Sequence, residues 1–375
     1  MLTANIQTYL PKILPAITAL RRELHGMPEK ALCEDRTRQC LYDFLKMQTA
    51  LRVEMQGPVL YAVWDAPHSV TDTDMPCLAF RADFDAVEGA DGTLGHYCGH
   101  DGHAASLAGL AMLISAMKPR CKIVLIFQPA EETGEGARLC LPILEKEGVT
   151  EIFGWHNIPG LPKGSVDLLP DTFACGSTGM SITVTGTPAH AAYPENGKNP
   201  AAVIASLVLF GEKLLQEPHE GMVLITVIGI SVGSEAYGVS ASKGELRLTL
   251  RAEKGRELDS IIEKMTFEAK RLAAAAGMAV EIAFHEPFPA TENHTASLEK
   301  MRQAVEEAHL TPVTPPEPFR WSEDFGHYLN EVPGAMIGVG SGCDYPALHT
   351  ADYAFRDDLL EDVLKIMGGL CMRAY

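Results

Sequence analysis

The sequence predicts an α/β protein in which a central sheet, largely parallel or mixed, is flanked by helices and a smaller α+β domain is inserted. Two observations lead to this fold class. Short apolar runs alternate with helical patterns in the first part of the chain, and the order β-α-β-β-α-β replaces this pattern after about Cys175. Strands that alternate with helices are typical of a buried sheet whose functional groups lie at the strand ends.

The first part of the chain supplies the elements expected for the central sheet. Apolar residues recur at helical spacing from Ile6 to Met27 and from Arg36 to Met47. The apolar runs that predict strands are Val59–Trp64, Cys77–Ala82, Lys122–Phe127 and Ile152–Trp155, and further helical patterns cover His103–Met117 and Gly136–Glu147. Because His103–Met117 is apolar on nearly every side, we expect this helix to lie in the interior.

The inserted segment has the order of a ferredoxin-like two-layer domain. Met180, Ile182 and Val184 alternate with polar residues, which indicates a half-exposed strand. The next elements are a helix at 201–216, strands at 222–232 and 246–250, a helix at 256–276 and a strand at 280–284. Helix and strand alternate again up to Ala335–Val339, so the C-terminal segment is expected to complete the first sheet. The predicted domains are therefore residues 1–176 together with 289–375, and the insertion at 177–288.

Length, charge and cysteine content limit the classes of function. The chain has 375 residues, 31 Lys and Arg against 49 Asp and Glu, and a net charge of −18. This charge repels phosphate backbones and anionic lipids, so neither a nucleic acid nor a membrane is an expected partner. No apolar stretch approaches the roughly 18 to 20 residues that cross a bilayer. Nine cysteines without a close CxxC pair, and a start without the pattern of a secretory signal, predict reduced thiols in the cytoplasm.

Four short polar clusters are placed at the ends of predicted strands. They are His96–His103, Gln128–Glu132, Trp155–Asn157 and Leu348–Thr350. Cysteine, histidine and carboxylate side chains together are the ligand set of zinc, cobalt, nickel or manganese. In the first cluster, Cys98 and His100 are separated by one glycine and can converge on one ion. The co-occurrence of all four clusters at one sheet therefore favours a metal site.

Each cluster taken alone also has a structural interpretation. A histidine after a strand, such as His156 or His349, is often a hydrogen-bonded structural residue, and Glu131 with Glu132 also fits a solvated acidic loop. Adjacent carboxylates in a short turn usually face different ways, however, so that one can bind metal while the other acts as a base. The glycine-rich stretch 338–342 has no lysine and no clear following helix, which favours a flexible loop leading to His349 over a phosphate loop.

Six short motifs occur in an order that belongs to one group of metallopeptidases. They are RRELHGMPE at 21–29, RADFDA at 81–86, CGHDGH at 98–103, PAEE at 129–132, GTPAHAA at 186–192 and SEDF at 322–325. With these motifs the chain resembles the amidohydrolase branch of the aminoacylase/carboxypeptidase dimetal peptidase family. The likeness covers essentially the whole chain, including the insertion.

The resemblance implies a complete site. It implies two divalent metal ions, zinc, manganese, cobalt or nickel, bound by Cys98, His100, Glu132, His156 and His349. Glu131 would be the general acid and base, and Asp85 would support the ligands, as expected where a ligand imidazole needs an acceptor on its other nitrogen. His103 matches a motif position without a ligand role, which favours packing or hydrogen bonding.

The resemblance also implies a substrate and an assembly. The substrate it implies is an N-acyl or N-aroyl amino acid, or a small dipeptide-like amide, whose amide bond is hydrolysed. His190, in the inserted domain, would reach the substrate and stabilise its developing oxyanion. The inserted domain would act as a lid and as the contact of a homodimer, an expectation that the apolar 201–210 helix supports.

Several alternatives stay open at the level of sequence. Cys98 could be a nucleophile activated by a neighbouring histidine, or the chain could be a non-catalytic descendant that binds a metal or ligand. The presence of both Glu131 and Glu132 argues against the second alternative. Arg251 could pair with a substrate carboxylate as a bidentate donor or be an exposed arginine at a strand end.

Overall fold

The computed structural model describes residues 2–65, 75–89 and 91–373, which form two compact units. The first unit contains Met1–Phe173, Thr291–Glu317 and Asp324–Tyr375, and the second contains Ala174–Ala290 and Pro318–Glu323. The sequence places residues 318–323 with the first unit, whereas in the structure they group with the second. Each unit has its own hydrophobic core. Among the described residues, no helix is both long and apolar enough to cross a membrane.

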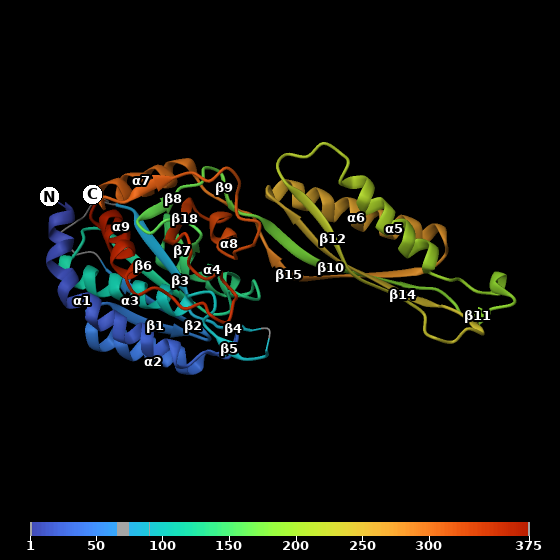
Figure 1. The fold of residues 1–375 in the computed structure, drawn as a ribbon, viewed down its shortest axis with the longest axis horizontal. Coiled ribbons are helices and arrows are strands. Elements are labelled where there is room, and N and C mark those ends of the chain that lie inside the picture. The colour runs from blue at the N-terminus through green and yellow to red at the C-terminus, as the bar shows by residue number, and fades with distance from the viewer. Residues whose placement is uncertain (1, 66–74, 90, 374–375) are drawn as a thin grey trace. The chain divides into compact units, whose positions relative to one another are not determined.

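The first unit is built on a mixed sheet (Figure 1). The four strands at its centre, β6, β3, β7 and β18, are parallel to one another, and antiparallel pairs flank them. The strands in spatial order are β1 (Arg52–Gln56), β2 (Val59–Trp64), β6 (Lys122–Gln128), β3 (Cys77–Asp83), β7 (Glu151–Pro159), β18 (Gly334–Gly342), β8 (Ser165–Asp167) and β17 (Thr311–Val313). The expected α/β class with a largely parallel or mixed sheet is confirmed.

Helices pack on the sheet of the first unit. They are α1 (Leu2–His25), α2 (Asp35–Gln48), α3 (His100–Met117), α4 (Gly136–Glu147), α7 (Thr295–Glu307), α8 (Gly326–Leu329) and α9 (Leu359–Arg373). As predicted, α3 lies in the interior, where it packs against both α1 and α9. Ile123, Leu125 and Phe127 of β6 belong to the core under these helices. The intervening β6 residues point to the opposite face, because side chains alternate along a strand.

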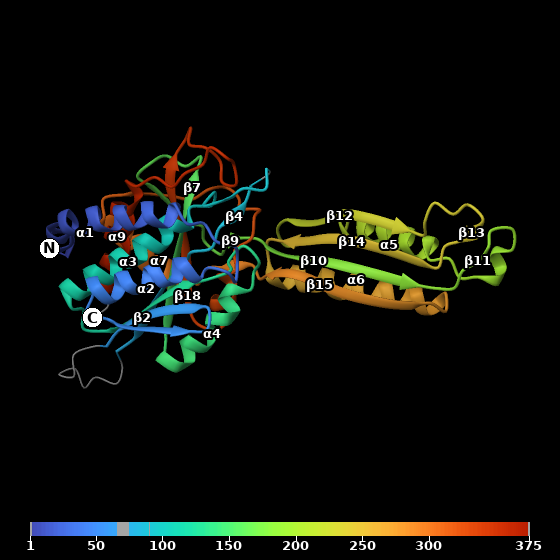
Figure 2. The ribbon, with the colours of Figure 1, turned by 90° about the horizontal axis from the view of Figure 1, so that it is seen from below.

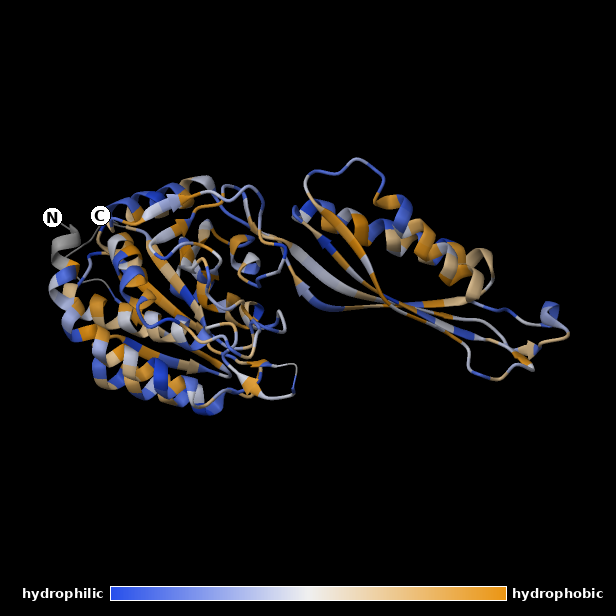
Figure 3. Cartoon of the chain, in the orientation of Figure 1, coloured by the Kyte–Doolittle hydropathy of each residue, from blue (hydrophilic) through white to orange (hydrophobic). Residues whose placement is uncertain are grey.

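The second unit has the ferredoxin-like arrangement that the sequence predicts. Its antiparallel sheet has the order β12 (Val223–Val232), β14 (Lys243–Ala252), β10 (Gly176–Thr185) and β15 (Ala279–Phe288). Helices α5 (Ala201–Leu214) and α6 (Gly255–Ala275) cover one face of this sheet (Figure 2). Apolar residues from the sheet and from both helices form the core of the unit. Hydropathy colouring shows that α5 is largely hydrophobic (Figure 3).

Short elements complete the two units. β4 (Val87–Glu88) pairs with β5 (Leu94–Gly95), β9 (Thr172–Ala174) with β16 (Thr291–Glu292), and β11 (Ala189–His190) with β13 (Val239–Ser240), and a short 3-10 helix covers Pro194–Asn196.

Three local predictions are wrong. Residues 338–342 are not a flexible loop but the end of β18, in which the glycines allow close packing: a Cβ on Gly340 would lie 2.2 Å from the carbonyl oxygen of Pro162. His156 and Asn157 lie inside β7 and not after it. Strand β1 has no counterpart in the prediction, because it lies at an edge and its one buried residue, Val53, leaves no apolar run.

Candidate metal centre

The predicted ligands come from segments at the carboxyl ends of the central parallel strands. Cys98 lies two residues before the start of α3, and His100 is the first residue of this helix. Glu132 follows β6, and His349 lies in the segment between β18 and α9. His156 lies within β7. Because the central strands are parallel, their carboxyl ends meet at one edge of the sheet and bring these distant segments together.

Gly99 sets the direction of the Cys98 and His100 side chains. It is the N-cap of α3 and has a φ of +93°, a left-handed conformation that favours glycine. A Cβ at this position would lie 2.7 Å from Oδ1 of Asn157 and 2.9 Å from the hydroxyl of Tyr353. Only glycine therefore fits between the cysteine and the histidine.

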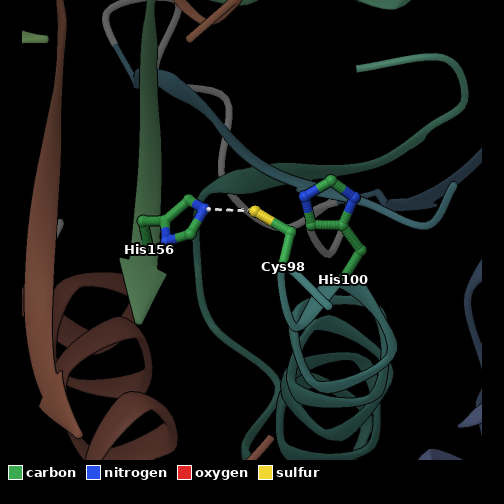
Figure 4. Close-up of side chains that lie close together, drawn as sticks. All are labelled: Cys98, His100 and His156. Atoms are coloured by element: carbon green, nitrogen blue, oxygen red, sulfur yellow. Dashed lines mark hydrogen bonds between the residues drawn. The ribbon is translucent and has the colours of Figure 1, made fainter. Parts of the chain in front are cut away.

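Three of the predicted ligands form a buried group. Potential ligand atoms of Cys98, His100 and His156 all lie within 4.8 Å of one another, and the Sγ of Cys98 is 3.5 Å from Nε2 of His156 (Figure 4). In Figure 4, His156 projects from β7 and the other two side chains from the start of α3. A sulfur and two imidazole nitrogens at this spacing can surround a single cation.

A second group shares the sulfur of the first. Potential ligand atoms of Cys98, Glu132 and His349 also lie within 4.8 Å of one another. Nε2 of His349 is 3.6 Å from Oε1 of Glu132, and the His349 side chain is half exposed. The backbone of His349 has a φ of +62° and its N–H donates to the carbonyl of Tyr97 at 2.8 Å. The structure thus brings all five predicted ligands together in two groups joined at Cys98.

The surroundings of His100 fit a cation. Its Nε2 is buried and has no hydrogen-bond partner among the described residues. Carboxylate oxygens of Glu132, Asp83 and Glu131 lie 3.7, 3.8 and 4.0 Å from this nitrogen. A buried, unbonded nitrogen that faces several carboxylates is the arrangement that a divalent metal ion would satisfy, and the sulfur, nitrogen and oxygen donors suit zinc, manganese, cobalt or nickel.

Asp85 orients two of the predicted ligands. Its Oδ1 lies 3.2 Å from Nδ1 of His100, and its Oδ2 accepts the backbone N–H of Glu132 at 3.0 Å. The carboxyl group is completely buried. Because Asp85 accepts the hydrogen bond of the Nδ1–H of His100, Nε2 is left to face the candidate metal centre. A metal ion needs the tautomer in which the proton is on Nδ1.

Glu131 is held by a strained loop. One of its carboxylate oxygens accepts the backbone N–H of Asp324 at 3.4 Å. The preceding residue, Ala130, has a φ of +52°, and its N–H donates to the buried Glu34 carboxylate at 2.8 Å. Such backbone strain is often found at functional sites. Burial, followed by the charge of Asp85, raises the pKa of Glu34 to about 7.

The ligand side chains have perturbed acidities. Burial, followed by the charge of Glu132, raises the pKa of the Cys98 thiol to about 12. Burial also lowers the pKa of His156. For His100 burial is the largest single influence and acts in the same direction, but the charge of Asp83 together with contributions from Cys98 and the hydrogen bond to Asp85 outweighs it and raises the pKa well above its usual value. Without metal, Cys98 is therefore a neutral thiol and a poor nucleophile, and a cation would have to displace protons from Cys98 and His100.

A buried network that the sequence did not single out lies behind Glu131. The Arg81 guanidinium contacts Asp83 and Asp324, each at 2.7 Å, and Oε1 of Gln128 at 2.8 Å. Oδ2 of Asp324 also accepts the backbone N–H of Ala137 at 2.8 Å. Arg81 and Asp83 belong to the RADFDA motif and Asp324 to the SEDF motif. The motifs do not reveal that these side chains contact one another, because those contacts are set by the fold.

Two candidate substrate residues belong to the second unit. His190 lies on β11, where its Nδ1 accepts the backbone N–H of Ala192 at 3.1 Å and its ring is exposed. Arg251 lies on β14, is partly buried, and donates to the hydroxyl of Ser322 at 2.7 Å and to the carbonyl of Arg320. Arg251 thus has partners within its own unit, and neither residue is part of the five-ligand centre.

Comparison with known proteins identifies the family. The model of peptidase family M20/M25/M40 matches residues 79–373. The chain belongs to this family. The resemblance predicted from the motifs is therefore confirmed, and this member of the peptidase family M20/M25/M40 is a hydrolase that acts on amide bonds.

Relatives and solved structures agree along the whole chain. An N-acetyldiaminopimelate deacetylase from Leuconostoc mesenteroides is 29% identical over 361 residues, which cover 88% of this chain and 90% of the relative. An N-acetyl-L-cysteine deacetylase from Bacillus subtilis is 26% identical and covers 89% of this chain and 82% of its own. A dinuclear metal binding M20 peptidase from Bacillus subtilis superposes with a TM-score of 0.81 at 22% identity, over 97% of this chain and 98% of its own.

Proposed function

We propose that this M20 family member is a metal-dependent amidohydrolase that cleaves an N-acyl amino acid into a carboxylic acid and a free amino acid. The observation that supports it most is the convergence of Cys98, His100, Glu132, His156 and His349 beside the carboxylate of Glu131. The names of the deacetylase relatives favour a small N-acyl substrate, because those proteins act on N-acetylated amino acids.

The five ligands would hold a pair of divalent cations. Bound there, such cations would polarise the substrate carbonyl and make a water molecule more acidic. Two of the ligand positions depend on Asp85, which bonds His100 and the backbone of Glu132. The protein would therefore supply a preorganised set of donors whose orientation does not depend on the substrate.

Glu131 would move the proton. Its neighbour Glu132 faces the ligands, whereas Glu131 is fixed by the N–H of Asp324 and places its other oxygen 4.0 Å from Nε2 of His100. A carboxylate beside the centre can take a proton from the attacking water and return it to the nitrogen of the departing amine. General acid and base catalysis of this kind typically contributes about 100- to 10,000-fold to a rate.

The second unit would complete the active site and join two chains. We infer that the exposed ring of His190 donates a hydrogen bond to the oxyanion that develops on the substrate. We also infer a homodimer formed through β12, an edge strand with the exposed apolar residues Leu224, Ile228 and Ile230. Long apolar edge strands are templates for pairing with a second chain.

A cysteine nucleophile is the less favoured mechanism. A nucleophilic Cys98 would need a lowered pKa, whereas burial and Glu132 raise it to about 12. Chelation separates the two mechanisms. A metal-dependent enzyme loses turnover on exhaustive chelation and regains it when a divalent metal is restored, whereas activity that survives chelation and is abolished by thiol alkylation would favour the nucleophile.

The function can be tested with a substrate panel. Metal-loaded protein is incubated with N-acetyl, N-benzoyl and N-aminobenzoyl amino acids, and the released amine is measured. We expect turnover of at least one N-acyl series and a loss of about 100-fold or more in kcat for Glu131→Gln, with metal content unchanged. The matched control is Glu135→Gln, an exposed residue of the same loop. Unchanged turnover in the Glu131 variant would remove this residue from the mechanism.

A further inference from the structure

A chain of buried polar side chains runs behind the candidate metal centre. Oδ1 of Asp83 lies 2.6 Å from Nδ1 of His103, and Nε2 of His103 lies 2.5 Å from Oδ1 of Asn157. The amide nitrogen of Asn157 donates to the hydroxyl of Tyr353. All four residues are nearly or completely buried. None of them belongs to the five predicted ligands.

The last two members of this chain support the turn between Cys98 and His100. The side-chain space of Gly99 is filled by Oδ1 of Asn157 and the hydroxyl of Tyr353, which lie 2.7 and 2.9 Å from the position of its missing Cβ. The amide of Asn157 cannot rotate freely, because its oxygen faces His103 and its nitrogen donates to Tyr353. The packing around Gly99 therefore depends on the position of the Tyr353 hydroxyl.

Tyr353 also belongs to the loop that carries His349. Its N–H donates to the carbonyl of Thr350 at 3.1 Å, which closes a tight turn directly after His349. The N–H of His349 donates to the carbonyl of Tyr97, the residue before Cys98. The His349 loop thus contacts the Cys98 turn in two places. One contact is the hydrogen bond from His349 to the carbonyl of Tyr97, and the other is the packing of the Tyr353 hydroxyl beside Gly99.

We propose that Tyr353 is a positioning residue that keeps His349 and Cys98 at ligand distance from a shared cation. The proposal rests on the proposed function, because it assigns a role toward the metal that the five ligands would bind. The hydroxyl acts through its hydrogen bond with Asn157 and its packing beside Gly99, and Tyr353 is not one of the five predicted ligands. Groups that orient metal ligands in this way typically change metal affinity by about 10- to 100-fold when they are removed.

The test compares two tyrosine hydroxyls of the same loop. Co²⁺ is titrated into the metal-free wild type, Tyr353→Phe and Tyr345→Phe. Affinity and the near-ultraviolet absorption of a cysteine thiolate bound to Co²⁺ are recorded. Tyr345 is the matched control, because its hydroxyl donates to the carbonyl of Ala354 at 2.7 Å and its ring contacts Tyr353 without reaching Gly99. We expect Co²⁺ to bind about 10- to 100-fold more weakly to Tyr353→Phe, with a weaker or shifted thiolate band, and normally to Tyr345→Phe.

Different outcomes separate the two proposals. A wild type that shows no thiolate band with Co²⁺ would contradict the proposed metal centre itself. If Tyr353→Phe has the same thiolate band and Co²⁺ affinity as the wild type, even with a lowered melting temperature, the hydroxyl is merely structural and the positioning role is overturned. An equal loss in Tyr345→Phe would also overturn it. If Tyr353→Phe does not fold, Asn157→Ser removes the same hydrogen bond together with the contacts of Asn157 to Gly99 and His103, and a wild-type band and affinity in this variant would overturn the proposal.

Discussion

Gly99 is the residue on which the geometry of the candidate centre depends most directly. It combines a φ of +93° with neighbours that leave no room for a side chain. We predict that Gly99→Ala weakens Co²⁺ binding strongly and destabilises the metal-free protein by about 1 to 3 kcal/mol, because backbone strain and a steric clash add up. Co²⁺ titration and urea unfolding measure the two effects.

Gly148 is the matched control for this variant. It has a φ of +68° at the end of α4, but no atom lies within 4 Å of its missing Cβ. Gly148→Ala should therefore cost about 1 kcal/mol from backbone strain alone and leave Co²⁺ binding unchanged. Equal effects of the two alanine variants on metal affinity would contradict the role assigned to Gly99.

Asp167 is a buried carboxyl group that the proposed mechanism does not use. Burial raises its pKa to about 7, whereas an unfolded aspartate has a pKa of about 3.9. The folded state therefore holds the proton more tightly, and its stability falls as pH rises from about 4 to about 7, after which the loss is complete.

Asp167→Asn should remove this pH dependence. We predict that the variant gains stability relative to the wild type as pH rises, by on the order of 4 kcal/mol between pH 4 and pH 8. Urea unfolding of both metal-free proteins at the two pH values measures the difference, and other titrating groups such as Glu34 cancel because both proteins contain them. A stability difference that is the same at both pH values would refute the prediction.

Some of the residues in the candidate site could be predicted from sequence and others could not. Cys98 and His100 were accessible because their side chains are neighbours in sequence and follow a known motif. Arg81 and Asn157 lie in a motif and a cluster that the sequence also shows, but their roles and that of Tyr353 were not predictable, because these roles come from hydrogen bonds to residues far along the chain. A buried polar residue reveals its partners only once the strands are in register.

At the scale of elements, Arg81 joins strand β3 to two other segments. Its guanidinium is nearly completely buried and binds Asp83, Gln128 and Asp324. We predict that Arg81→Met destabilises the protein by about 3 to 5 kcal/mol, because it leaves two buried carboxylates without their cation. Urea unfolding at neutral pH measures the change.

Arg52 provides the comparison. It also lies on a strand and pairs with carboxylates, Glu54, Asp65 and Glu147, but its side chain is 39% exposed. Exposed pairs contribute about 0 to 1 kcal/mol. Because the buried Glu147 also keeps its ion pair with Lys122 at 2.7 Å, Arg52→Met should have a small effect. If both methionine variants lost the same stability, burial would not be the reason for the importance of Arg81.

The elements themselves were predictable where a hydrophobic pattern is long and regular. Strands β2, β3 and β6 are buried on both faces and therefore appear as continuous apolar runs. The interior helix α3 was equally clear. Edge strand β1 and the glycine-rich end of β18 were missed, because one is mostly polar and the other uses glycine for close packing and not for flexibility.

At the scale of the whole molecule, the inferred homodimer depends on the edge of the second unit. Ile228 on β12 is 61% exposed, and among the described strands β12 lies at the edge of its sheet and pairs with β14. We predict that the wild type sediments as a dimer at micromolar concentration and that Ile228→Glu is monomeric, because a charge on the edge opposes pairing with a second strand.

Phe267→Glu is the control for the dimer. Phe267 is 68% exposed on α6, a helix that packs on β10, β14 and β15. This variant should remain dimeric. A wild type that is monomeric at micromolar concentration, or a dimer that survives Ile228→Glu and dissociates with Phe267→Glu, would contradict the proposed interface.

The two-unit organisation was predictable because the hydrophobic pattern of the sequence changes where the chain enters the second unit. Buried runs give way to alternating residues near Met180, and the order of strands and helices changes with them. Residues 318–323, which group with the second unit, were not predictable, because a short segment far along the chain carries no periodic pattern.

The central claim is that five donors from four segments far apart in the sequence hold cations beside Glu131. Anomalous diffraction from crystals of the zinc-loaded protein tests it most directly. We predict two peaks about 3.5 to 4 Å apart, both in contact with the sulfur of Cys98, one near His100 and His156 and the other near Glu132 and His349. A map with no metal peak at the Cys98 sulfur would contradict the claim.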